Sequence, residues 1–271
     1  MMSIKLTILG SGGSIPTPRP FCSCALCLKA KEEGEPYKRN SSSLFVHGIN
    51  AVIDCGEDVA ESLNRRNIKR VDRLFITHWH PDHTFGLRLI LESNFDFSKR
   101  KPIRPLHLYI PSKVLQGLTK YYGIFDYLIN KRKTAILHTT EHGDEIKIDD
   151  ISVKTIGYKG KESDTYAYSI ERGSKKILYS PCDTIEFDNY KKFRNLDLWI
   201  TECGVLTTHL SEILFNAMIQ RIMKIRPKKT ILTHLEEPDI ASFSLDYPNG
   251  LKKKYRDLNI DFAYDGMEIK I

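Results

Sequence analysis

Short apolar runs bounded by turn-forming residues recur along most of this chain, and such runs are typical of β-strands. They cover residues 4–9, 42–46, 51–53, 71–76, 106–110, 145–148, 151–156, 165–170, 176–180, 196–201 and 230–233. Apolar positions three and four residues apart predict helices between some of these strands. The clearest cases are Ser112–Tyr122, where Val114 and Leu118 share one face, and Glu212–Ile225, for which Ser211 is a natural N-cap.

The strand predicted over residues 71–76 leads into a dense group of ligand-type residues, His78, His80, Asp82 and His83. An apolar helical pattern follows, so the group lies on a strand-to-helix turn, where side chains converge beyond the end of a strand. Imidazoles and a carboxylate suit zinc, manganese or iron at neutral pH. The alternative is a solvated polar loop, but four ligand-type residues within six positions favour a metal site.

Three of the six cysteines, Cys22, Cys24 and Cys27, also stand close together. Six cysteines in a chain of this length do not make a disulfide scaffold. Three thiols within six positions are typical of a structural zinc site, and the alternative is three unrelated reduced thiols. We therefore expect a zinc-knuckle insertion near residues 21–28.

The composition is that of an ordinary globular chain, since 271 residues of which 41% are hydrophobic can bury a full core. No Pro/Gly/Ser-rich linker, low-complexity tract or short repeat interrupts the sequence, so we expect a single domain over residues 1–271. The first residues do not resemble a signal peptide, and no apolar run approaches the length of a membrane span. We expect a cytoplasmic protein with no membrane partner.

The formal net charge of +7 favours anionic partners, including phosphate esters and nucleic acid. A lysine-rich, solvated surface gives the same charge without any function attached to it. Charge alone therefore does not choose between these two interpretations.

The order His78-x-His80-x-Asp82-His83 after a strand resembles the signature of the metallo-β-lactamase superfamily. The resemblance implies an α/β fold, a four-layer αββα sandwich of two β-sheets flanked by helices, with the metals at one edge. It implies that His78 and His80 bind a first metal and that Asp82 and His83 bind a second. It also implies that Asp54 orients the metal-binding turn by hydrogen bonds and binds no metal itself.

Three later positions match further functional residues of this superfamily. Asp183, after a predicted strand, matches the bridging aspartate ligand, and His234 matches the last metal ligand. His209 stands just before a predicted helix, where phosphodiesterase branches carry a histidine that contacts the phosphate or protonates the leaving group. Without the resemblance, Asp183 is only an acid after a strand and His209 only a histidine in a loop.

One ligand implied by the resemblance is missing. The superfamily places a third histidine for the first metal shortly before the strand 165–170, and this chain has none there. An ungapped comparison puts Lys161 at that position; a protonated lysine cannot bind a metal, but its charge can replace that of a lost ion. The alternative is that Glu162 supplies a carboxylate and keeps both metals. We expect one or two active-site metals, zinc or manganese, besides the structural zinc.

The cysteine knuckle narrows the resemblance. With the stretches Arg39–Ser42 and Tyr264–Ile269, it is similar to the PhnP-like phosphodiesterase subgroup, and the knuckle is also found in the PqqB group. In that subgroup a histidine three residues beyond the last active-site histidine completes the zinc site, and here that position is Glu237. A carboxylate can also bind zinc. The implied structural zinc site consists of Cys22, Cys24, Cys27 and Glu237.

The resemblance implies a metal-dependent phosphodiesterase that hydrolyses a small phosphodiester, cyclic ones included, through a metal-bound hydroxide. The catalytic residues that it implies are His209 as general acid, Lys161 as stabiliser of developing charge, and Asp82. We expect an anionic phosphodiester as the partner, and a homodimer as the oligomeric state.

Two alternative functions stay open. The first is an RNA-processing endonuclease of the tRNA 3′-end type, which would take nucleic acid as its partner. The basic charge favours it, but the sequence has no long Gly/Pro-rich arm of the kind that holds tRNA in that branch. The second is a non-hydrolytic binding or accessory protein that has lost one metal ligand.

Overall fold

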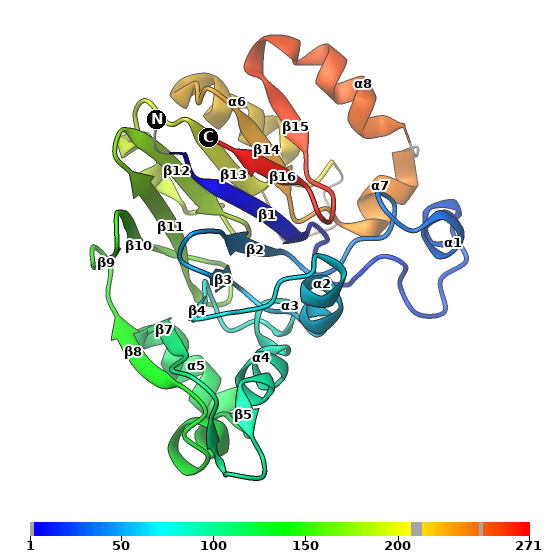
Figure 1. Cartoon of the computed structure of the whole chain (residues 1–271). Helices are drawn as coiled ribbons and strands as arrows, with labels where there is room; N and C mark the ends of the chain where they lie inside the picture. The colour runs from blue at the N-terminus through cyan, green and yellow to red at the C-terminus, as the bar shows by residue number, and fades with distance from the viewer. Residues whose placement is uncertain (1–2, 207–212, 244–245) are drawn as a thin grey trace.

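Two seven-stranded β-sheets lie face to face in the centre of the molecule (Figure 1). The computed structural model describes residues 3–206, 213–243 and 246–271. The first sheet has the order β16 (Glu268–Lys270), β1 (Lys5–Gly10), β2 (Ser43–Val46), β3 (Ala51–Ile53), β4 (Arg73–Phe75), β7 (His107–Pro111) and β8 (Ile136–Thr140). The second has the order β15 (Ile260–Phe262), β14 (Thr230–Thr233), β13 (Leu198–Glu202), β12 (Lys175–Ser180), β11 (Asp164–Arg172), β10 (Ile151–Lys159) and β9 (Glu145–Ile148).

Helices cover the outer face of each sheet. The first sheet is covered by α2 (Val59–Arg65), α4 (Leu87–Ser93) and α5 (Ser112–Tyr121), and the second by α6 (Phe215–Ile225) and α8 (Tyr247–Lys254). The other elements are α1 (Ala25–Glu33), α3 (Pro81–Thr84), β5 (Phe95–Asp96), β6 (Lys101–Pro102), α7 (Glu237–Phe243), and the short helices Tyr127–Lys131, Asp188–Lys192 and Arg256–Leu258.

Three apolar clusters explain this layering. One lies between the sheets and joins residues of both, such as Leu6 and Ile200. A second lies under α6, where Trp199 packs with Ile222, and a third lies under α4 and α5. Trp199 and Ile200 are neighbours in β13 but belong to different clusters, because successive side chains of a strand point to opposite faces. The expected four-layer αββα sandwich is confirmed.

Strand direction decides where a site can form. In the first sheet β3, β4, β7 and β8 run parallel to one another, and in the second β12, β13, β14 and β15 do so. Parallel strands bring their carboxyl ends to the same edge of a sheet, and the turns that follow them lie together there. The predicted ligand turns follow β4, β12 and β14.

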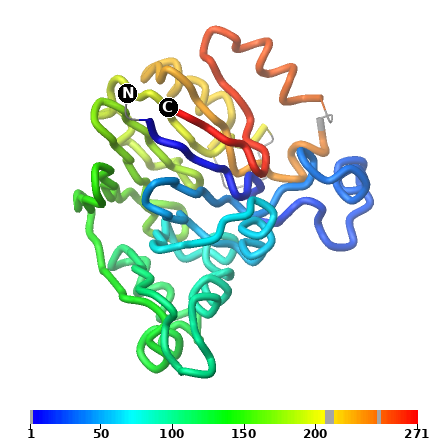
Figure 2. Tube along the Cα trace, in the orientation of Figure 1, coloured from blue at the N-terminus to red at the C-terminus, as the bar shows by residue number. Residues whose placement is uncertain are grey.

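The two ends of the described chain lie side by side (Figure 2). Ile4 and Ile271 exchange two backbone hydrogen bonds of 3.0 Å, and β1 pairs antiparallel with β16. The closing segment predicted from the resemblance therefore forms an edge of the first sheet.

Helix α6 begins later than the sequence predicts. It starts at Phe215 and not at Glu212, and Ser211 lies outside the described residues. The amide of Val205 donates to the carbonyl of Ile213, and the amide of Phe215 donates to the carbonyl of Val205, each at 2.8 Å. This bridge holds residues 213–214 extended, so the helix cannot start before Phe215.

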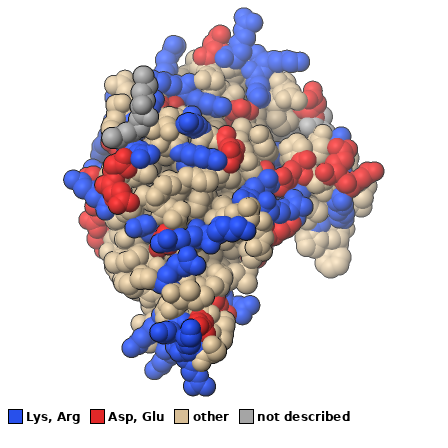
Figure 3. Space-filling view, viewed as in Figure 1, with Lys and Arg blue, Asp and Glu red and all other residues tan. Residues whose placement is uncertain are grey.

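Within the described residues, no helix has the length and apolar character needed to cross a lipid bilayer. Figure 3 shows Lys and Arg side chains spread over the top, middle and bottom of one face, with Asp and Glu side chains between them. On this face the charge has the distribution of a solvated surface and not that of a single basic patch.

Candidate metal centre

The histidine cluster lies where strands of both sheets end. His78, His80, Asp82 and His83 follow β4, and the last two belong to the single turn of helix α3, which starts with Pro81. Proline suits the first turn of a helix, because its missing N–H has no partner there and its φ is already helical. His234 follows β14 of the other sheet directly.

Three site residues have a left-handed backbone. Asp54 directly follows β3 with φ 62°, His234 directly follows β14 with φ 55°, and Asp183 stands three residues after β12 with φ 55°. Non-glycine residues with such φ values are uncommon and cluster at functional sites. Here each one turns the chain sharply at the end of a strand.

Asp82, His83 and His234 form one compact group of expected ligands. Asp82 Oδ2 lies 3.1 Å from His83 Nε2 and 3.3 Å from His234 Nε2, and all three side chains are buried. Within the described part of the chain, His83 Nε2 makes no hydrogen bond in spite of this short distance. Asp82 and His234 are hydrogen-bonded to each other, whereas His83 Nε2 faces Asp82 without a bond. Three buried donor atoms that converge in this way fit a shared metal ion, and these residues therefore fit the second metal expected from the resemblance.

Asp54 holds this group in place. Its Oδ1 accepts a hydrogen bond from the amide of Thr77 at 2.8 Å, and its Oδ2 accepts one from Thr77 Oγ1 at 2.8 Å. The same Oδ2 lies 2.9 Å from His83 Nδ1, so the other ring nitrogen of His83 faces Asp82. A carboxylate behind a ligand histidine fixes its tautomer and orientation, which is the geometry that the expected orienting role of Asp54 requires.

His78 and His80 form the other half of the cluster. His78 Nε2 lies 3.1 Å from His80 Nδ1, and His78 Nδ1 lies 2.9 Å from Thr77 Oγ1. Glu162 Oε2 lies 3.9 Å from His80 Nε2, and the Glu162 side chain is 70% exposed. In this arrangement Glu162 faces the nitrogen of His80 that points away from His78.

Lys161 contacts the site through its backbone amide and not through its side chain. Its amide donates to both carboxylate oxygens of Asp183, at 3.0 and 2.8 Å, and its side chain is exposed. Gly160 lies against the same carboxylate, since a Cβ at this position would be 2.1 Å from Asp183 Oδ2. Asp183 thus anchors the β10–β11 connection, where the resemblance places the missing histidine.

Cys182 is the member of the cluster that sequence reasoning missed. Its Sγ and one ring nitrogen each of His78 and His83 all lie within 4.8 Å of one another, and all three residues are buried. Asp183 belongs to neither of the two groups of ligand atoms found among the described histidines and acids of this cluster. The only sequence signal was the place of Cys182, next to a predicted ligand at the end of a strand.

Glu236 supports His234 from the other side. Its Oε1 lies 3.4 Å from His234 Nδ1 and accepts a hydrogen bond from the amide of Ser14 at 2.8 Å. A Cβ on Gly13 would lie 2.0 Å from this oxygen, so glycine is needed where the loop passes the carboxylate. Sequence reasoning missed Glu236 as well, because the contact joins segments that are far apart in the chain.

The electrostatics of the cluster favour a bound cation. Burial lowers the pKa of His78 well below its usual value and lowers the pKa of His80, so both rings are neutral donors. Burial alone would raise the pKa of Asp82, but His83 and His234 hold it well below its usual range. Burial opposes a proton on His83, yet Asp82 and Asp54 raise its pKa well above the usual value. A positive charge at His83 Nε2 is therefore stabilised by two carboxylates.

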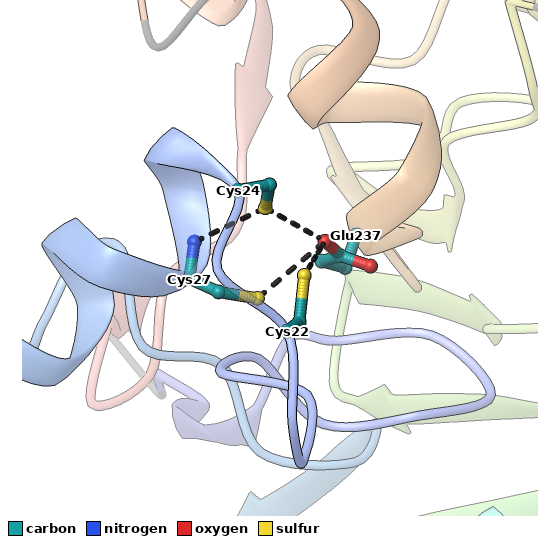
Figure 4. A group of neighbouring side chains, drawn as sticks. All are labelled: Cys22, Cys24, Cys27 and Glu237. Atoms are coloured by element: carbon teal, nitrogen blue, oxygen red, sulfur yellow. Dashed lines mark hydrogen bonds between the residues drawn. The ribbon is translucent and has the colours of Figure 1, made fainter.

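The three clustered cysteines converge on one acid (Figure 4). Glu237 Oε1 accepts hydrogen bonds from the thiols of Cys22, Cys24 and Cys27 at 3.5, 3.0 and 3.4 Å. Cys24 caps α1, since its sulfur accepts a hydrogen bond from the Cys27 amide at 3.4 Å. Arg19 Nε lies 3.3 Å from the other oxygen of Glu237. Three sulfurs and one carboxylate oxygen form the donor set of a closed, four-coordinate zinc site, and these residues fit it.

His209, the expected general acid, lies outside the described residues. The structure thus brings together His78, His80, Asp82, His83 and His234 at one site and Cys22, Cys24, Cys27 and Glu237 at another. Asp54 and Asp183 lie at the edge of the first site, with Lys161 and Glu162 on the loop beside it.

Residues 49–235, more than half of the chain, match the family model of the beta-lactamase superfamily domain. Ribonuclease Z of Archaeoglobus fulgidus is 27% identical over 197 residues, which are 66% of this chain and 55% of that protein. Ribonuclease Z of Clostridium tetani is 29% identical over 129 residues, 47% of this chain and 36% of that protein. This chain thus spans about half, or less, of the length of the curated relatives that it matches.

Solved structures with the same fold cover the whole chain. A diphosphatase of the PhnP family superposes with a TM-score of 0.80 at 24% identity, over 100% of this chain and 98% of that one. Zinc-bound PqqB from Methylobacterium extorquens gives 0.75 at 16% identity, over 98% and 99% of the two chains. Human tRNase Z, short form, gives 0.67 at 19% identity, over 98% of each chain. At these identities the similarity shows the fold.

Proposed function

Because this chain belongs to the β-lactamase superfamily, we propose that it is a metal-dependent hydrolase that cleaves a small phosphodiester, cyclic ones included. The observation that carries the proposal is the buried group Asp82, His83 and His234. The ligand atoms of these three residues converge on one point, and His83 Nε2 makes no hydrogen bond there. The fold agrees over its full length with a PhnP-family diphosphatase.

The residues that would hold the metals come from three strand ends. They are His78, His80, Asp82, His83, His234 and the turn at Cys182 and Asp183. A divalent metal bound there lowers the pKa of water, so that hydroxide is available near neutral pH.

The other residues orient and position. Asp54 keeps His83 in the tautomer that presents Nε2 to the centre, and Glu236 supports His234. Asp183 holds the backbone of the β10–β11 connection through Lys161, and the Lys161 and Glu162 side chains on this connection are exposed. The role of His209 as general acid to the leaving oxygen stays a prediction from sequence.

The cysteine knuckle has a structural role in this proposal. A zinc ion held by Cys22, Cys24, Cys27 and Glu237 would tie the loop before α1 to α7, which lies far away in sequence. It would also fix the segment from His234 to Glu237, which includes a residue of the histidine cluster.

Ribonuclease activity is the second candidate, because the curated relatives named above are ribonucleases Z. Against this reading, the described residues of the connections near the site include no long Gly/Pro-rich arm. A small diester needs no such arm to be held.

A substrate comparison tests the proposal. Zinc- and manganese-loaded protein is assayed with bis(p-nitrophenyl) phosphate, with cyclic nucleotides and with a precursor tRNA that carries a 3′ trailer. We expect turnover of the small diesters and little or no cleavage of the tRNA. Cleavage at the tRNA 3′ end at a higher kcat/KM would make the ribonuclease reading the correct one. A fully metal-loaded protein that cleaves none of these substrates would contradict the proposal and support an accessory protein.

A further inference from the structure

We propose that the cavity between helices α2 and α4 (Figure 1) is a binding site for a small anion with an aliphatic body. The cavity has a volume of about 280 Å³ and is open to solvent on one side. None of the expected metal ligands lines it, so its occupant is not the substrate of the proposed hydrolase. The inference therefore stands apart from the metal centre.

The apolar walls of the cavity are the first argument. They come from α2, from the turn that follows it and from α4, and they consist mainly of Val59, Leu63, Ile68, Val71, Leu89 and Ile90. Leu63, Val71 and Leu89 are only partly buried, so apolar surface stays accessible inside the cavity. Removing such surface from water is the main driving force for binding an apolar body.

The walls are held in fixed positions. Helices α2 and α4 meet at Gly86, where a Cβ would lie 2.6 Å from Val59 Cγ1. The Gly86 amide donates to the carbonyl of Cys55 at 2.9 Å. At the other end of α4, Asn94 Nδ2 donates to the carbonyl of Arg104 at 2.6 Å. A preformed cavity binds its ligand without the cost of ordering the walls.

The charges at the cavity are the second argument. Lys69, Arg70 and Arg104 line it, and the described lining residues include no acid. Arg70 pairs with Asp72, whereas within the described part of the chain the side chains of Lys69 and Arg104 make no hydrogen bond or ion pair. Arg104 is half-buried, so part of its side chain is out of water without an ion-pair partner. An anion in the cavity would supply the opposite charge, and the planar guanidinium suits carboxylate and phosphate groups.

The size of the cavity and the side chains around it narrow the class of ligand. Ordinary ligand pockets measure about 300–1,000 Å³, so this cavity takes only a small molecule. No aromatic side chain is among the described lining residues, so a nucleobase would have nothing to stack on. Short alkyl carboxylates and alkyl phosphates combine an aliphatic body with an anionic head, and they are the class that we assign to the cavity.

Methyl NMR of the whole zinc-loaded protein locates the ligand directly. Hexanoate and hexyl phosphate are titrated separately, with hexanol as the probe that lacks the charge and inorganic phosphate as the probe that lacks the aliphatic body. We expect saturable shifts of the Val59, Leu63 and Leu89 methyl resonances with both alkyl anions. Hexanol should bind at least about tenfold more weakly, the usual loss for a charged hydrogen bond, and inorganic phosphate should leave these resonances unmoved. The alkyl anion with the lower Kd identifies the preferred head group.

Two variants test the charge and the cavity separately. Arg104→Gln should weaken the binding of hexyl phosphate about tenfold or more. Lys101→Gln is the matched control, because it removes a nearby exposed cation that does not line the cavity, and it should change the Kd by less than about twofold. Ala60→Phe places a ring at a position that lines the cavity and should abolish the shifts. The methyl resonance of Ile200, between the two sheets, reports that each variant is folded.

Three results would overturn the inference. The first is a wild-type protein whose cavity methyl resonances do not move with either alkyl anion at millimolar concentration. The second is hexanol that binds as tightly as hexyl phosphate, and the third is an Arg104→Gln variant with the Kd of wild type. The readout involves no turnover, so each of these results would leave the proposed hydrolase intact.

Discussion

The two metal-type clusters of this protein differ in how the chain builds them. In the knuckle, three of the four donors lie within six residues, and all of them meet at one carboxylate oxygen. In the histidine cluster the donors come from turns after β4, β12 and β14, in both sheets. The first site is a local loop closed by one distant acid, whereas the second exists only when the whole sandwich has formed.

The two sites also differ in what surrounds the donors. The knuckle donors contact mainly one another and Arg19. Behind the histidines stand further groups, Asp54 behind His83, Thr77 behind His78 and Glu236 behind His234. Such support fixes tautomer and direction, which a catalytic centre needs more than a structural ion does.

One short segment joins the two sites. His234 belongs to the histidine cluster, Glu236 supports it, and Glu237 closes the knuckle. Loss of the knuckle metal should therefore disturb the active site through this segment, whereas loss of the active-site metal should leave the knuckle intact. The following variants test the two sites one at a time.

The largest effect is expected from a ligand of the histidine cluster. His234→Ala should reduce phosphodiester turnover to the background rate and lower the active-site metal content, because it removes a donor that faces Asp82. The knuckle metal should stay bound, as measured by metal analysis. His47→Ala, which removes a histidine bonded to Thr7 on β1, is the control and should keep wild-type turnover. Near-normal turnover of His234→Ala would contradict the proposed centre.

The next largest effect is expected from the knuckle. Cys24→Ala removes both a donor and the cap of α1, and structural zinc contributes directly to folding free energy. We expect a fall in Tm of several degrees or a loss of soluble protein, together with a loss of zinc. Leu28→Ala, an exposed position of the same helix, is the matched control for thermal unfolding. Unchanged stability with full zinc content would show that the knuckle binds no structural ion.

An intermediate effect is expected from Asp54, which contacts the expected ligand His83. Asp54→Asn keeps the shape of the side chain but loses the charge that orients His83. Metal affinity or turnover should fall about 10- to 100-fold, the usual range for a partner of a ligand histidine. Asp72→Asn changes a buried acid bonded to Asn50 and Arg70, and it controls for a general loss of stability. If Asp54→Asn and Asp72→Asn bound metal equally well, Asp54 would not have the orienting role assigned to it.

The smallest effects are expected on the β10–β11 connection. Glu162→Ala should lower turnover by about tenfold, at the low end of that range, because the carboxylate faces His80 but is largely exposed. Lys161→Ala keeps the amide that holds Asp183, so its metal content should equal that of wild type. A loss of metal in Lys161→Ala, or a larger loss of turnover than in Glu162→Ala, would reverse this assignment.

Much of the fold could be predicted because its signals are local. The hairpin of β2 and β3, helix α5 and the strand before His78 follow from apolar spacing within a few residues. The start of α6 could not be predicted, because the bridge between Val205 and residues 213–214 is a tertiary contact that overrides the helical pattern.

The same division holds for the sites. His78, His80, Asp82 and His83 are recognisable because the ligands are close in sequence. The place of Cys182 beside His78 and His83, and the bond between Asp183 and the Lys161 amide, depend on the left-handed turn and on a loop earlier in the chain. The spacing of apolar and polar residues does not reveal either contact. Glu236 was missed for the same reason, since its partner Ser14 lies at the other end of the chain.

Anomalous scattering at the zinc absorption edge, on crystals of the unmutated protein grown with zinc, tests the central claim most directly. The account predicts one peak enclosed by Cys22, Cys24, Cys27 and Glu237, and at least one more between Asp82, His83 and His234. A zinc peak at the knuckle together with no peak at the histidine cluster would contradict this account.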